Sequence, residues 1–126
     1  MTKLTTFDAR FRKSAFKVAA ELGLDFISTK RQVENGSLMF YDDDTDTKYT
    51  ISESGYVRRY IRGTYSFQPT WRAYQLNPTT QSKIPTHTYK GEQMYRTETI
   101  RHMVLDPNAQ LGILVKAVIN YREKNC

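Results

Sequence analysis

Arginine and aromatic side chains interleave along one stretch of the chain that is also free of acidic residues. No Asp or Glu occurs from Tyr56 to Gly91. Guanidinium groups neutralise phosphates and aromatic rings stack on bases, so this composition is typical of a surface that binds nucleic acid. An antiparallel sheet with one solvated face has the same composition, because cross-strand Tyr and Arg pairs stabilise such a face without any ligand.

Strand periodicity decides which of these side chains can act together. On a strand over residues 56–62, alternate side chains point to opposite faces. Tyr56, Arg58, Tyr60 and Arg62 then share one face, while Val57, Arg59 and Ile61 share the other, with Val57 and Ile61 in the core. Trp71 is either a core anchor or a stacking ring, and Arg72 either binds a ligand or stacks on a neighbouring ring. The predicted ligand-binding residues are Tyr56, Arg58, Tyr60, Arg62, Trp71, Arg72, Lys83 and Lys90.

Four acidic residues have the spacing of ligands in a calcium-binding loop. They are Asp42, Asp44, Asp46 and Glu53. The position that needs Gly for the sharp turn is occupied by Thr47, and both flanks have the alternation of strands. We therefore expect the tip of a hairpin here and no metal site.

Other catalytic and cofactor patterns are missing from the sequence. There is no glycine-rich phosphate loop and no nucleophile motif. His87 and His102 have neither Cys nor carboxylate at metal-ligand spacing, so an enzyme that uses them is the least favoured hypothesis. We expect a non-enzymatic protein without a metal or a cofactor.

Whole-chain properties limit the class of protein. The 126 residues are enough for one domain over 1–126, and the net charge of +6 favours anionic partners. The single cysteine, Cys126, excludes an internal disulfide and fits a reducing, cytoplasmic setting. No apolar stretch approaches the roughly 20 residues that a membrane span requires.

Periodicity predicts an α+β fold, in which an antiparallel β-meander of four or five strands is packed by an N-terminal and a C-terminal helix. An apolar stripe predicts a helix over 6–22, capped by Thr6 or Asp8 and ended by Gly23. Asp106-Pro107 begins the second helix. The expected strands are 26–33, 37–41, 48–52, 56–62 and 71–76, with a hairpin turn at Asn35-Gly36. Asn77 to Lys90 is expected to be a long exposed loop, and 92–105 is ambiguous, with helix slightly favoured over strand.

Two functions of different kinds follow from these patterns. The first is a small binding protein for nucleic acid or another phosphate-bearing ligand, which uses the basic and aromatic face of the sheet. The alternative is a protein-interaction module, an inhibitor or accessory subunit, that acts through the 77–90 segment or a strand edge. Homo-oligomerisation is compatible with both, because a short meander leaves edges to be covered.

Overall fold

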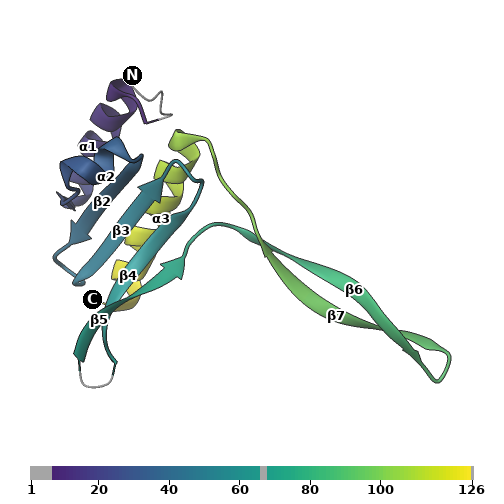
Figure 1. The fold of residues 1–126 in the computed structure, drawn as a ribbon. Helices are drawn as coiled ribbons and strands as arrows, with labels where there is room; N and C mark the ends of the chain where they lie inside the picture. Colours follow the sequence, from purple (N-terminus) through teal and green to yellow (C-terminus); the bar gives the residue numbers. More distant parts are fainter. Residues whose placement is uncertain (1–6, 66–67, 126) are drawn as a thin grey trace.

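The computed structural model describes residues 7–65 and 68–125, so Thr6 and Cys126 lie outside the described residues. The fold is α+β, as predicted, with the elements arranged as in Figure 1. Along the chain these are α1 (Ala9–Leu22), β1 (Asp25–Phe26), α2 (Lys30–Glu34), β2 (Ser37–Asp42), β3 (Thr47–Ser52), β4 (Val57–Tyr65), β5 (Gln68–Gln75), β6 (Thr79–Tyr89), β7 (Glu92–Arg101) and α3 (Pro107–Asn125). Among the described residues, no helix is long and apolar enough to cross a membrane.

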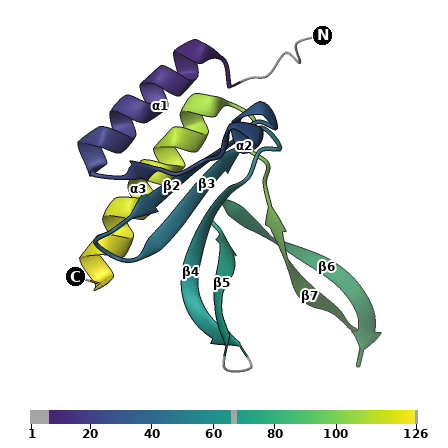
Figure 2. The same cartoon turned by 60° about the vertical axis from the view of Figure 1, so that its left-hand side comes forward.

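The body of the molecule is a five-stranded antiparallel meander with α1 and α3 on one face (Figure 2). The strands lie in the order in which they occur in the sequence, β1 to β5. Buried side chains from both helices and from β2, β3 and β4 form one apolar core between the helices and the sheet. They include Phe11, Ala15, Leu114 and Val118 from the helices and Leu38, Phe40, Tyr49, Ile51 and Val57 from the strands.

Both long helices have a predicted cap at their start, and α1 ends at the predicted glycine. The Asp8 carboxylate accepts the Phe11 N–H at 2.8 Å, which satisfies one of the free donors at the start of α1. Gly23 ends α1 with a φ of 73°, a conformation that costs glycine little. At α3, the Asp106 carboxylate accepts the Asn108 N–H at 3.1 Å, so the predicted Asp-Pro start is confirmed.

The segment between α1 and β2 differs from the expected strand over 26–33. The strand is only Asp25–Phe26, with one further backbone hydrogen bond from the Ile27 N–H to the Met39 carbonyl, and residues 30–34 form the short helix α2. Thr29 and Gln32 make a reciprocal capping box that favours this helix over a strand. Asn35 is its C-cap, so the Asn-Gly pattern here ends a helix and does not form a hairpin turn.

The largest correction concerns residues 77–105, for which we expected a long loop over 77–90 and, over 92–105, an ambiguous segment with helix slightly favoured over strand. The structure has a long antiparallel hairpin of β6 and β7, called the arm below, which projects away from the body (Figures 1 and 2). Its tip residues Lys90 and Gly91 have φ angles of 51° and 81°, as a tight turn between twisted strands requires. Pro85 is accommodated because a hairpin has free edges, and the pairing register shifts between Pro85 and Thr88.

A buried side-chain amide anchors the arm to the body. Asn77 is 3% exposed, and its oxygen accepts the Val57 N–H at 2.7 Å. Its amide nitrogen donates to the carbonyls of Gly55, at 2.6 Å, and His102, at 2.8 Å. One side chain therefore joins the start of β4, the turn before it and the end of the arm.

A second buried amide connects α3 to the same region. Gln110 is fully buried and donates to the carbonyls of Ser52, at 2.8 Å, and Val104, at 2.7 Å. Its oxygen accepts the Ser52 N–H at 3.1 Å. The end of β3 and the strand-to-helix connection after the arm are thus held to α3 by polar contacts inside the core.

We predict that Asn77→Ala lowers the free energy of unfolding by about 3 kcal/mol, because it leaves buried backbone groups without partners. The matched control is Gln81→Ala, which removes an amide bonded to Thr99 on the exposed arm. It should cost no more than about 0.5 kcal/mol, because water replaces the lost partner. Urea denaturation followed by circular dichroism measures both values, and equal losses would contradict the anchoring role.

Candidate nucleic-acid interface

The sheet face opposite the helices carries much of the predicted site, and we call it the open face. Its described positions on β2 to β5 follow from the strand register and contain no acidic residue; they are Ser37, Met39, Tyr41, Lys48, Thr50, Ser52, Arg58, Tyr60, Arg62, Trp71, Ala73 and Gln75. The predicted alternation on β4 is confirmed for Arg58, Tyr60 and Arg62, which share this face, and for Val57, which is buried in the core. Ile61 faces the helix side as predicted but is only half-buried and does not belong to the core cluster, so its predicted place in the core is wrong.

Trp71 lies on the open face beside two cations and does not belong to the core cluster. The Lys48 Nζ is 4.3 Å and the Arg62 Cζ is 4.5 Å from the centre of the Trp71 ring. β4 brings Arg62 directly opposite Trp71, and β3 brings Lys48 opposite Tyr60, one row away. These cation–π contacts hold the ring and both charges in place before any ligand arrives.

The turn between β2 and β3 supplies an acidic border to this face. Asp46 accepts hydrogen bonds from Arg62 at 2.7 Å and from the Tyr41 hydroxyl at 2.6 Å. The Arg62 hydrogen bond lowers the pKa of Asp46, and the Tyr41 bond adds to the effect. The charge of Arg62 is therefore partly compensated, which leaves Lys48 and Arg58 as the cations without an ion pair on the described part of this face.

The other predicted residues are not all brought to the open face. Tyr56 precedes β4 and lies beside Arg58, with 5.7 Å between the ring centre and the Cζ. Arg72 points to the opposite face, where its Cζ lies 5.5 Å from the Tyr74 ring. Lys83 and Lys90 lie on the arm, away from the sheet (Figure 1). The predicted set is thus divided among three surfaces.

A basic groove of about 440 Å³ on the helix side was not predicted from the sequence. Its cationic side chains are Arg59, Lys116 and Lys124, above apolar contacts from Leu76 and Ile113. Arg59 is already engaged, since it donates to the Ala117 carbonyl at 3.0 Å and its Cζ lies 4.3 Å from the Tyr121 ring. The spacing of Lys116 and Lys124 places both on one side of α3. This pair could therefore have been recognised from the sequence.

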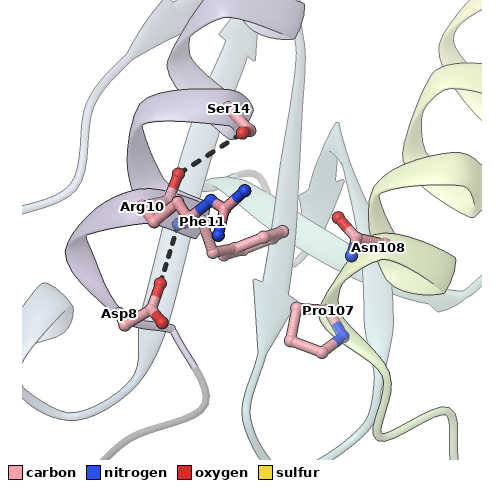
Figure 3. A pocket seen from close by; sticks show the side chains of 6 residues that line it. All are labelled: Asp8, Arg10, Phe11, Ser14, Pro107 and Asn108. Atoms are coloured by element: carbon pink, nitrogen blue, oxygen red, sulfur yellow. Dashed lines mark hydrogen bonds between the residues drawn. The ribbon is translucent and has the colours of Figure 1, made fainter.

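A second cleft, of about 410 Å³, lies between the starts of α1 and α3 (Figure 3). Arg10 is the cation among its lining residues. Two of the polar side chains, Asp8 and Ser14, are already bonded within α1: the Asp8 carboxylate caps the helix and the Ser14 hydroxyl donates to the Arg10 carbonyl. Arg10 belongs to α1, which lies on the helix side of the sheet (Figure 2), so Arg10 does not join the open face.

The acidic hairpin between β2 and β3 stabilises the fold through Asp42. Asp42 is fully buried and accepts two hydrogen bonds from Arg122 of α3, both at 2.9 Å. Burial raises the pKa of Asp42, but the hydrogen bonds and charge of Arg122 outweigh it, so the pKa lies below its ordinary value. Among residues 7–65 and 68–125, no three potential metal ligands come together.

The two histidines lie in or just after the arm and bond to hydroxyl groups. The His102 Nε2 is 2.8 Å from the Thr80 hydroxyl, and the His87 Nδ1 is 3.1 Å from the Thr86 hydroxyl. Both histidines are exposed, and the ring nitrogens that bond here contact hydroxyl groups of threonine. These contacts support the arm and do not resemble a nucleophile with its base.

Comparison of the chain with known protein families, curated proteins and solved structures gives no match. The open face, the basic groove and the arm therefore have to be interpreted from their own geometry.

We predict that Asp42→Asn lowers the free energy of unfolding by about 2–3 kcal/mol at pH 7, because a buried charged hydrogen-bond pair is lost. A carboxylate with a depressed folded pKa stabilises the protein above its unfolded pKa, near 3.8 for Asp, and loses this effect as the pH falls through the folded value. The difference between wild type and variant should therefore shrink from about pH 4 downward.

The control is Asp44→Asn, since the Asp44 carboxylate is 70% exposed and 3.8 Å from Arg122. Its effect should stay within about 0.5 kcal/mol. Urea titrations across this pH range measure both, and a difference for Asp42→Asn that does not change with pH would contradict the assignment.

Proposed function

We propose that this chain is a small, non-enzymatic binding protein that takes nucleic acid, or another phosphate-bearing ligand, on the open face. The observation that carries the proposal is the absence of acidic side chains from the described positions of this face on β2 to β5, together with three cations and the three aromatic rings of Tyr41, Tyr60 and Trp71. Two acids border these positions: Asp25 of β1 lies opposite Tyr41, and Asp46 is bonded to Arg62.

Each group on the open face has a role that its chemistry suits. Lys48 and Arg58 neutralise phosphates, and the rings of Tyr60 and Trp71 offer stacking surfaces for unpaired bases. Arg62 is held by Asp46 and positions the Trp71 ring. A fixed sheet face with rings favours single-stranded over double-stranded nucleic acid, because duplex bases are already stacked on each other.

We predict that the double variant Lys48→Gln/Arg58→Gln binds nucleic acid more weakly than the wild type, with an affinity that depends less steeply on salt. Loss of two phosphate contacts should reduce the slope of log K against log salt by about 1.4 for a single strand. Fluorescence anisotropy of a labelled oligothymidylate over a range of salt measures this slope.

The matched control is Lys116→Gln/Lys124→Gln, which removes the same charge from the basic groove. It should leave the slope unchanged. If the groove variant loses affinity and the open-face variant does not, the ligand binds to the helix side. If neither wild-type protein nor variants bind any oligonucleotide or polyphosphate at low salt, the proposed function is wrong.

The stacking part predicts that Trp71→Leu weakens binding of a single strand by about fivefold to 150-fold, the range that corresponds to about 1–3 kcal/mol per stacked base. Tyr74→Leu is the control, because Tyr74 lies on the same strand but faces the opposite side. Tryptophan fluorescence should also be quenched on binding, as Trp71 is the single tryptophan. Equal losses in both variants would contradict a role for the open face.

A protein-interaction module is the second candidate, and the exposed arm favours it. The 77–90 segment is half of a projecting hairpin, and both strands of that hairpin have an outer edge without a strand partner among the described residues. The arm and the open face are separate surfaces, so the two functions do not exclude each other.

A further inference from the structure

The arm is a two-stranded ribbon with very little protein around it. Every residue of β7 is exposed, and β6 is a strand of 11 residues that extends over about 36 Å. A two-stranded hairpin alone is marginally stable in water, and a free edge presents a row of unpaired backbone groups. Such an element is expected to gain a partner.

The two edges of the arm are not equally suited to pairing. On β6, Pro85 has no N–H to donate, and the register shifts between Pro85 and Thr88. On β7, Glu92–Arg101 runs for 10 residues without Pro or Gly. The regular edge that another strand can join is therefore that of β7.

We propose that β7 pairs with β7 of a second copy of this chain, antiparallel, around a two-fold axis at Thr97. The sequence of β7 is self-complementary in this register. Thr97 of one copy lies opposite Thr97 of the other. Outward from this centre, the opposed residues are Arg96 with Glu98, Tyr95 with Thr99, Met94 with Ile100, Gln93 with Arg101 and Glu92 with His102.

The even-numbered side chains carry the complementarity, and they share one face of the ribbon. Arg96 of each copy meets Glu98 of the other, so the axis generates this opposite-charge pair twice. Met94 and Ile100, which are 40% and 43% exposed, cover each other. Exposed apolar side chains and an acid on this face suit a protein partner better than a phosphate backbone.

Neighbouring registers are worse, which makes the pairing specific. An axis at Arg96 places the two guanidinium groups opposite each other and Met94 opposite Glu98. An axis at Glu98 places two carboxylates opposite each other and Arg96 opposite Ile100. Like charges directly opposite destabilise a sheet, so Thr97 is the favoured centre.

The fold leaves room for this assembly. The arm projects clear of the helices and of the five-stranded sheet in both views (Figures 1 and 2). Pairing of the two β7 edges makes a four-stranded sheet in the order β6, β7, β7, β6, and antiparallel packing places the two bodies at its opposite ends.

Cysteine cross-linking tests the position of the axis. In a Cys126→Ser background, Thr97→Cys should form a covalent dimer under mild oxidation, because directly opposed residues have Cα atoms about 4.5–5.5 Å apart, within the range of a disulfide. The control is Lys83→Cys, since Lys83 pairs with Thr97 within the arm but lies on β6. Cross-linking of both variants to the same extent, or no dimer from Thr97→Cys, would overturn the proposal.

Charge exchange tests the register in the full chain. Sedimentation velocity should show a wild-type dimer, and Arg96→Glu or Glu98→Arg should each weaken it about tenfold or more, because two attractive pairs become repulsive. The double variant Arg96→Glu/Glu98→Arg restores both pairs and should restore the dimer. A wild-type protein that stays monomeric to its highest soluble concentration, or a double variant as weak as the single ones, would rule out this interface.

Discussion

The buried carboxamide of Asn77 is the interaction on which the placement of the arm depends. It satisfies backbone groups of Gly55 and Val57, at the turn and the start of β4, and of His102, which follows β7 and is far from them in the sequence. Because the Val57 N–H and the Gly55 carbonyl make their bonds to Asn77 in buried surroundings, no solvent molecule replaces a lost partner there. Gln110 acts in the same way on α3, so two amides set both the direction in which the chain leaves the body and the place to which it returns.

The positive charge of the chain is distributed according to what each cation contacts. Arg122 is bonded to buried Asp42, and Arg59 is held by a carbonyl and by the Tyr121 ring, so both support the core. Lys48 and Arg58 lie outside such ion pairs on the open face, and Lys116 and Lys124 line the basic groove. Cations that could neutralise phosphates therefore lie on two separate surfaces. The open face differs from the groove because it also carries the rings of Tyr60 and Trp71.

The proposed dimerisation of the arm would affect ligand binding at the open face. A dimer through β7 carries two open faces on one particle, and a nucleic acid that reaches both gains affinity without any new contact. Under the proposed function, a base would stack on a Trp71 ring that cation–π contacts already position, which would reduce the ordering cost of binding. The proposed dimer would therefore strengthen the proposed ligand binding.

The sequence by itself determined the elements that have strong local periodicity. The apolar stripes of α1 and α3, their caps at Asp8 and Asp106, and the alternation that puts Arg58 and Val57 on opposite faces of β4 follow from neighbours along the chain. Only the tertiary structure decided the arm, because a solvent-exposed hairpin has no core and leaves no apolar pattern, and its Lys90-Gly91 turn is not a common hairpin dipeptide.

The same limit applies to the division of Trp71 and Arg72 between two faces and to the pairing of Asp42 with Arg122. Each of these depends on strand register or on contacts between residues that lie far apart in the sequence. Local periodicity could place Arg58, Tyr60 and Arg62 on one surface, but it could not show that Trp71 joins them while Arg72 does not. The sequence was enough to group Arg58, Tyr60 and Arg62, whereas strand register added Lys48 to the candidate site and removed Arg72 from it. Lys83 and Lys90 were removed because long-range packing places them on the arm.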